Sequence, residues 1–154
     1  MRTLKVEPIR NGTVIDHIAA GNAMKVLRIL GVPSPGWRSI VSIAMNVPTA
    51  KGPGQKDIIK IEDRELDPSD IDKIALVAPE ATVNIIRNFE VAEKAKVTLA
   101  DEVTGLLKCE NANCISNHKE PVKPRFRVMS RSPPRLRCAY CDREVEDVAR
   151  AVIV

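Results

Sequence analysis

Four cysteines between positions 109 and 141 constrain this chain more than any other feature, because no cysteine precedes them. They form two close pairs, Cys109-x4-Cys114 and Cys138-x2-Cys141, separated by 23 residues. Each pair can sit on one tight turn, so that four thiolates converge on a single ion at about 2.3 Å. Soft sulfur ligands favour zinc over a rubredoxin-like iron site, which usually has two x2 pairs.

Four protein ligands leave no coordination position for water or substrate, so the expected zinc ion is structural and not catalytic. Free thiols or a labile disulfide are the alternatives, and His118 is a possible substitute ligand that a complete cysteine set does not need. A module of about 55 residues with few large apolar side chains has little core. Zinc contributes about 10–16 kcal/mol of apparent binding free energy at neutral pH, so we expect the module to unfold without it.

The first 98 residues predict alternating strands and helices. Apolar residues recur at helical spacing from Ala20 to Leu30, and Asp67 followed by Pro68 is a strong helix start. Strands are expected over residues 4–9, 13–18, 37–47, 59–61, 82–86 and 89–97, with a loop over 48–55.

This order is the split βαβ arrangement of a ferredoxin-like domain, an antiparallel sheet with two helices on one face. Near Thr98 the composition shifts to prolines, cysteines and short β-like segments. We therefore predict an α+β chain, with a ferredoxin-like domain over residues 1–98 and a small all-β zinc-binding domain over 99–154.

Composition excludes several classes of protein. No apolar run approaches the roughly 20 residues that span a bilayer, and no leader opens the chain, so we expect a cytoplasmic protein without membrane contact. The net charge of +4 is mild, although residues 119–137 hold seven basic side chains against one acid. A zinc-ribbon nucleic-acid-binding protein is the alternative, but only 3% of residues are aromatic and base stacking needs more.

Several segments resemble the regulatory chain of aspartate carbamoyltransferase. They are GTVIDHI at 12–18, KDIIKIE at 56–62, APEATVN at 78–84 and CENANCIS at 109–116, together with the spacing of both cysteine pairs. The resemblance covers nearly the whole chain in the right order.

The resemblance implies a non-catalytic subunit. Its N-terminal domain is expected to bind the nucleotide effectors ATP, CTP and possibly UTP. Its zinc domain is expected to dock onto a separate catalytic chain, which joins carbamoyl phosphate to aspartate in pyrimidine biosynthesis. Regulatory chains of this family pair through their N-terminal domains, and three such dimers bridge two catalytic trimers.

The resemblance also implies the site residues. Two lysines four apart on one strand face suit a polyphosphate, with a third beside them, while a carboxylate meets the ribose and a histidine lies near the phosphates. The implied effector-binding residues are Glu7, Pro8, Ile9, Asp16, His17, Lys56, Ile58, Lys60, Asn84, Ile86, Phe89, Val91 and Lys94. Asn111 and Asn113 are the implied contacts with the catalytic chain.

Each assignment has a plainer alternative. Lysines on a strand face are usually its solvated side, His17 can be a half-buried side chain, and Phe89 can belong to the core. Asn111 and Asn113 can be a polar metal-binding turn that faces solvent. The combined segments favour the effector site over these alternatives.

Overall fold

The computed structural model describes residues 8–50, 54–118, 122–131 and 133–153. No helix within these ranges combines the length and apolar character needed to cross a bilayer. In the N-terminal part, the elements are β1 (Gly12–Ala19), α1 (Ala23–Leu30), β2 (Val41–Pro48), β3 (Gln55–Glu62), α2 (Pro68–Ala75), β4 (Thr82–Arg87) and β5 (Glu90–Lys96). The C-terminal part contains β6 (Glu102–Thr104), η1 (Ile115–Asn117), β7 (Arg125–Arg131), β8 (Pro134–Cys138) and α3 (Val148–Ala151).

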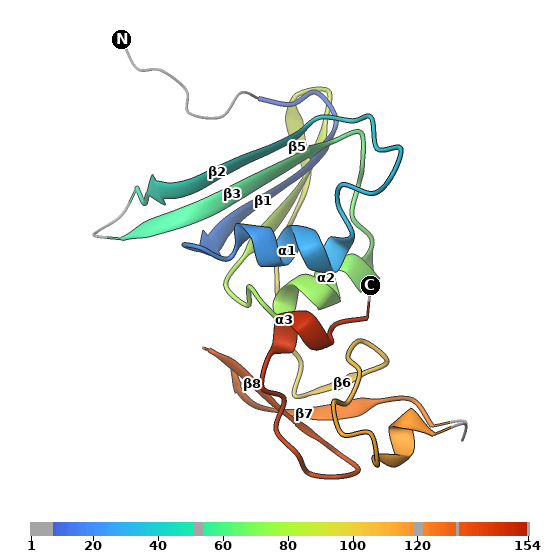
Figure 1. Cartoon of the computed structure of the whole chain (residues 1–154). Helices are drawn as coiled ribbons and strands as arrows, with labels where there is room; N and C mark the ends of the chain where they lie inside the picture. The colour runs from blue at the N-terminus through green and yellow to red at the C-terminus, as the bar shows by residue number, and fades with distance from the viewer. Residues whose placement is uncertain (1–7, 51–53, 119–121, 132, 154) are drawn as a thin grey trace.

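The N-terminal strands form one antiparallel sheet in the order β2-β3-β1-β4-β5. Two strand–helix–strand units interleave in it, so that β1 and β3 lie at the centre, and β5 extends the sheet through a hairpin with β4. Figure 1 shows α1 and α2 together on one face of this sheet. The predicted ferredoxin-like arrangement is confirmed.

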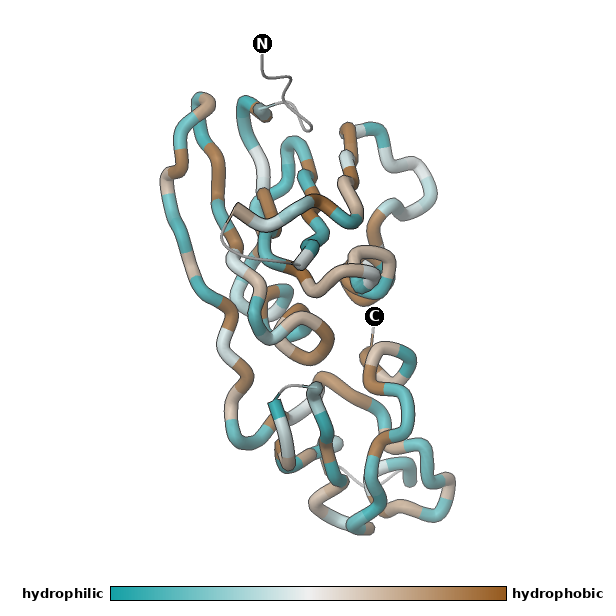
Figure 2. Tube along the Cα trace, turned by 90° about the vertical axis from the view of Figure 1, so that its left-hand side faces the viewer, coloured by the Kyte–Doolittle hydropathy of each residue, from teal (hydrophilic) through white to brown (hydrophobic). Residues whose placement is uncertain are grey.

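The two faces of the sheet differ in burial because strand side chains alternate. On β3, Asp57, Ile59 and Ile61 are fully buried towards the helices, while Lys56 and Lys60 lie on the other face and are partly exposed. Figure 2 shows how apolar (brown) and polar (teal) residues follow one another along the chain. Among the described residues, no helix packs on the second face.

Local sequence signals define the start of α2 and the end of α1. The Asp67 carboxylate accepts a hydrogen bond from the Asp70 N–H, and the Asp70 carboxylate accepts one from the Asp67 N–H. This capping box, together with Pro68, caps α2 as predicted. Gly31 ends α1 in the left-handed region at φ 68°. Asn22 gives α1 no side-chain cap, and the buried Asp57 on β3 accepts from the Ala23 N–H instead.

The C-terminal part is a three-stranded sheet, β6-β7-β8, with α3 packed beside α1. The all-β description is confirmed, and α3 adds one helical turn that the sequence analysis did not predict. Leu107 pairs with Val152 and the Lys108 N–H donates to the Ala151 carbonyl at 2.8 Å, which ties the chain end to the cysteine segment. One continuous cluster of buried side chains includes residues of both parts.

Three local predictions differ from the structure. The strand expected over 37–47 begins at Val41, because residues 34–37 form a turn in which the Trp37 N–H donates to the Ser34 carbonyl. Phe89 lies in the β4–β5 turn and not in a strand. The strand expected over 4–9 lies mostly outside the described residues, and positions 8 and 9 are not in a strand.

Gly12→Ala should destabilise the fold strongly. Gly12 has φ 141°, and a Cβ there would meet the Ile61 carbonyl oxygen at 2.1 Å, so β1 and β3 would have to separate. We expect a loss of about 3 kcal/mol or more in the free energy of unfolding. Gly36→Ala is the control, because φ is 80° but nothing lies within 4 Å, and it should cost about 1–2 kcal/mol. Equal denaturation midpoints would contradict this account.

Candidate metal centre and ligand-binding face

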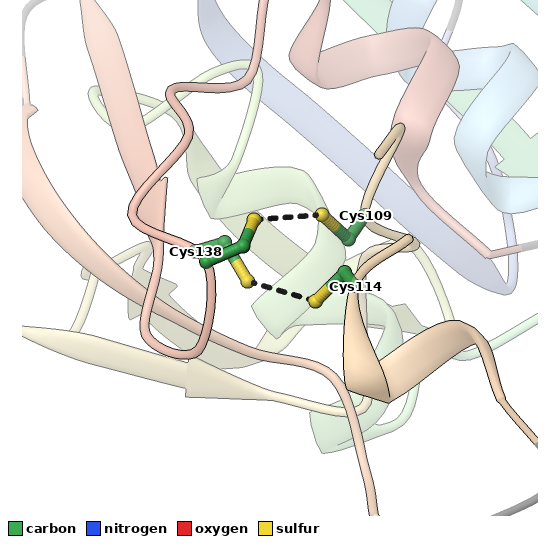
Figure 3. Close-up of side chains that lie close together, drawn as sticks. Cys109, Cys114 and Cys138 are labelled. Carbon is green, nitrogen blue, oxygen red and sulfur yellow. Dashed lines mark hydrogen bonds between the residues drawn. The ribbon is translucent and has the colours of Figure 1, made fainter. Parts of the chain in front are cut away.

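The four cysteine sulfurs form one compact cluster, all within 4.8 Å of one another. Sγ of Cys109 lies 3.6 Å from Sγ of Cys141, and Sγ of Cys114 lies 3.6 Å from Sγ of Cys138, the pairs joined by dashed lines in Figure 3. Disulfide sulfurs are about 2.05 Å apart, whereas bonds of about 2.3 Å to a tetrahedral ion place sulfurs about 3.8 Å apart. The geometry fits a metal ion held by all four thiolates.

Backbone turns and asparagine side chains hold the first cysteine pair. The Cys114 N–H donates to the Asn111 carbonyl at 2.9 Å, and the Asn117 amide donates to the carbonyls of Cys109 and Asn111 at 2.8 and 2.7 Å. The Asn113 N–H donates to Oδ1 of Asn111. These bonds fix the loop from within the chain, so that two sulfurs point inward.

A tight turn between β8 and the following segment holds the second pair. The Asp142 N–H donates to the Cys138 carbonyl, and Asp142 adopts a positive φ of 63°. Cys138 is fully buried at the end of β8, while Cys141 is the only partly exposed member of the cluster. Four thiolates bound to one ion would leave no coordination position for water or substrate.

Burial shapes the acidity of these thiols in the metal-free chain. It raises the pKa of Cys109 to about 12 and also raises the pKa of Cys138. Burial acts in the same direction on Cys141, but hydrogen bonds from the Arg143 N–H and the Asn111 side chain outweigh it and lower the pKa of Cys141 to about 7. Metal binding must therefore displace protons from Cys109 and Cys138 near neutral pH.

A second candidate site is a hollow of about 320 Å³ on the face of the N-terminal sheet opposite α1 and α2. Its lining combines lysines, one carboxylate, amide and hydroxyl groups, and apolar side chains, which is a composition suited to a charged, partly apolar ligand. The lining residues are Pro8, Ile9, Val14, Asp16, His17, Lys60, Thr82, Asn84, Ile86, Phe89, Val91 and Lys94.

Strand register explains how residues far apart in sequence meet there. Lys60 on β3 pairs with Val14 on β1, Val14 pairs with Asn84 on β4, and Asn84 pairs with Lys94 on β5. These four residues form one row across the sheet, about 14 Å from end to end at strand spacings of about 4.8 Å. Two ammonium groups thus flank an apolar side chain and an amide.

A bulge in β1 forms one corner of the hollow. Asp16 and His17 occupy it, with His17 at a positive φ of 58°. Lys56 Nζ lies 3.0 Å from the Asp16 carboxylate, and His17 Nδ1 lies 3.4 Å from the Thr82 hydroxyl. Lys56 therefore adjoins the hollow through Asp16 without lining it.

Phe89 adopts a conformation that bulky residues rarely take. Asn88 and Phe89 have φ values of 54° and 66° in the turn between β4 and β5, a position usually filled by glycine. The Phe89 side chain is 65% exposed and borders the hollow. Backbone strain of this kind is commonly retained where the side chain has a role in binding.

The structure brings most of the residues implied by the resemblance into this hollow. Lys56 and Ile58 lie on the same face of β3 but outside the lining, and Glu7 lies outside the described residues. Val14 and Thr82 line the hollow although the sequence analysis did not select them. Each precedes a selected residue by two positions on its strand, and that period of two was the available signal.

The basic segment is largely neutralised by ion pairs within the C-terminal part. Arg125 binds Glu102, Arg127 and Arg137 share Asp142, Arg131 binds Asp101, and Arg135 binds Glu144. Lys119 lies outside the described residues. Because these arginines already have carboxylate partners, the segment does not favour the nucleic-acid-binding alternative.

Comparison with known proteins gives two family matches, one in each part of the chain. Residues 4–98 match the description "Aspartate carbamoyltransferase regulatory chain, allosteric domain", and residues 101–149 match the metal binding domain of the same chain. A regulatory chain from Methanothermobacter thermautotrophicus is 55% identical over 143 residues, which cover 93% of this chain and 90% of the relative.

Two other regulatory chains show a similar likeness. The one from Thermococcus gammatolerans is 53% identical, with 95% of each chain covered, and the one from Thermofilum pendens is 53% identical, with 98% of this chain and 92% of the relative covered. The chain therefore belongs to the aspartate carbamoyltransferase regulatory chain family, as a regulatory and not a catalytic subunit.

Proposed function

We propose that residues 1–98 bind the nucleotide effectors ATP, CTP and UTP, and that residues 99–154 dock onto the catalytic chain of aspartate carbamoyltransferase. Nucleotide binding then controls the catalytic chains of pyrimidine biosynthesis in the cytoplasm. The observation that carries this proposal is the cross-strand row from Lys60 to Lys94, because it places two cations beside an amide and an apolar wall.

Each part of a nucleotide has a suitable partner in the hollow. The lysines attract a polyphosphate as point charges, and the Asp16 carboxylate can accept from ribose hydroxyls. Asn84 offers both a donor and acceptor to a base edge, while Ile86 and Phe89 supply apolar contact. Lys56 and His17 at the bulge supply further positive or hydrogen-bonding groups for the phosphates.

We infer that the metal is zinc. Four thiolates at tetrahedral spacing are the ligand set of structural zinc sites. The cysteine loops also present exposed groups: Asn113 lies between the first pair, Ile115 follows Cys114 and Tyr140 precedes Cys141. Because the metal fixes both loops at once, it shapes the surface that we propose for catalytic-chain docking.

One edge of the sheet is a candidate interface for the proposed homodimer. β2 and β5 are the edge strands of the sheet, and the surface of β5 carries several charged side chains. In contrast, Ile43 and Met45 of β2 and Met24 of α1 are exposed, and an apolar hollow of about 470 Å³ lies between α1 and β2. A second copy packed along β2 would cover these groups, and three such dimers would join two catalytic trimers.

The route from effector to catalytic chain runs through packed elements. α1 covers the sheet that carries the hollow and also packs against α3. α3 is in turn tied to the segment that leads into Cys109. Rigid-body shifts across such interfaces typically carry coupling free energies of about 1–3 kcal/mol.

The experiment that tests the function is assembly with the matching catalytic chain, followed by aspartate saturation curves with ATP, CTP and UTP.

Lys94→Ala should weaken nucleotide binding by about tenfold or more, since hydrogen bonds to charged groups contribute about 1.5–3 kcal/mol. Lys25→Ala on the exposed side of α1 is the control and should respond like the unmodified chain. Aspartate saturation curves of the assembled complex that no nucleotide changes would contradict the effector proposal.

Zinc affinity should fall steeply on acidification. The raised pKa values keep Cys109 and Cys138 protonated in the metal-free chain near neutral pH, so zinc releases at least two protons as it binds. The association constant should therefore drop at least about 100-fold between about pH 7.5 and about pH 6.5. Chelator competition at the two pH values measures this, and a pH-independent constant would contradict ligation by these thiols.

Ile43→Lys should dissociate the proposed dimer by placing a charge at the apolar edge of β2. Sedimentation equilibrium of the zinc-loaded chain should then report monomers at concentrations where the unmodified chain dimerises. Met129→Lys, at an exposed apolar position of β7, is the control and should leave the dimer intact. A dimer that survives Ile43→Lys would place the interface elsewhere.

A further inference from the structure

Asp57 is a fully buried carboxylate on the helix-facing side of β3, and it does not line the hollow. Its Oδ2 accepts hydrogen bonds from the N–H groups of Gly21 and Ala23 at 2.9 and 3.0 Å, and its Oδ1 accepts from the Asn46 N–H at 3.0 Å. A charged group costs much to bury unless hydrogen bonds compensate it. These three bonds satisfy that requirement and give Asp57 fixed partners on both sides of β3.

Both neighbours of β3 bulge beside this residue. The register of β1 shifts between Ile15 and Ile18, and the register of β2 shifts between Ala44 and Val47. A bulge takes one backbone N–H out of the regular strand pairing. The carboxylate binds one such N–H, that of Asn46 in the β2 bulge, where φ is 61°.

The β1 bulge decides which side chains reach the hollow. Ile15 and Ile18 are both fully buried although they are three positions apart, which a regular strand with a period of two cannot achieve. The extra residue lets Asp16 and His17 both line the hollow. Asp57 pairs with Ile18 and binds the Gly21 N–H just beyond β1, so it anchors the chain that leaves the bulge.

We propose that Asp57 is a positioning residue for the nucleotide hollow. By holding the β2 bulge, the start of α1 and the end of β1 to one carboxylate, it fixes where Asp16 and His17 stand. This proposal rests on the proposed function, because it assigns the support of the same site.

Asp57→Asn distinguishes three possible roles of this residue by the change in nucleotide affinity. The amide has one acceptor oxygen, so its NH₂ group must face at least one backbone N–H that the carboxylate now binds. A positioning role predicts weaker nucleotide binding. A purely electrostatic role predicts tighter binding, because a negative charge near an anionic ligand is removed. A purely structural role predicts lost stability with unchanged affinity.

Thr13→Val is the matched control. Thr13 is fully buried on β1, the strand that carries the bulge; its hydroxyl donates to the Arg64 carbonyl at 2.7 Å and accepts from the Leu66 N–H at 3.2 Å. It lies before the bulge and outside the hollow. Its replacement removes two buried hydrogen bonds without touching the Asp57 partners.

The experiment uses the full zinc-loaded chain, with ATP and CTP as probes in calorimetric titrations and NMR of the His17 ring as a second readout. Asp57→Asn should weaken both nucleotides by about tenfold, the effect of losing one well-placed preorganising hydrogen bond. It should also shift the His17 resonances. Thr13→Val should lower the unfolding temperature and change neither readout.

Hydrogen exchange of the unmodified chain provides a test that does not depend on a variant folding. Nucleotide should slow exchange at the Gly21, Ala23 and Asn46 amides, while the Leu66 amide stays unchanged. Unchanged or tighter binding by Asp57→Asn with unmoved His17 resonances would overturn the proposal. If the unmodified chain binds neither nucleotide, the proposed function fails, and the His17 resonances of the two variants alone decide the positioning role.

Discussion

Four thiol groups within 4.8 Å of one another organise the C-terminal part of this protein. A three-stranded sheet of this size has a small core of its own, so sulfur–metal bonds would add to its folding free energy. They also join two loops that lie far apart in sequence. Without a metal ion, no sulfur–metal bonds would hold the exposed residues next to Cys114 and Cys141 in a fixed relative position.

The two faces of the N-terminal sheet have different surroundings: one packs against α1 and α2, and the other carries the hollow. Alternation places Ile15 of β1 and Ile59 and Ile61 of β3 against the helices, and it places the two lysines of β3 on the opposite side. The β1 bulge departs from this alternation where Asp16 and His17 meet the hollow. Phe89 departs from ordinary backbone geometry at the other side of the same hollow. Local irregularities thus gather at the proposed effector site.

The two parts of the chain share one buried cluster, in which α1 and α3 pack side by side. α1 therefore contacts both the sheet below the hollow and the helix linked to the metal loops. In the proposed function, a nucleotide that shifts the sheet by a small amount would act on packed side chains, and dense interiors transmit displacement. This continuity gives the proposed regulation a physical basis.

The sequence alone was enough to predict the cluster of four cysteines, the α2 cap at Asp67 and the order of strands and helices, since these depend on short spacings and local hydrogen bonds. The sequence also indicated most of the residues that line the hollow, but only through its resemblance to the regulatory chain family. Tertiary structure decided that Lys60, Val14, Asn84 and Lys94 form one row, because strand register depends on pairing between distant segments. It likewise decided the bulges around Asp57 and the contact of α1 with α3, which no local pattern encodes.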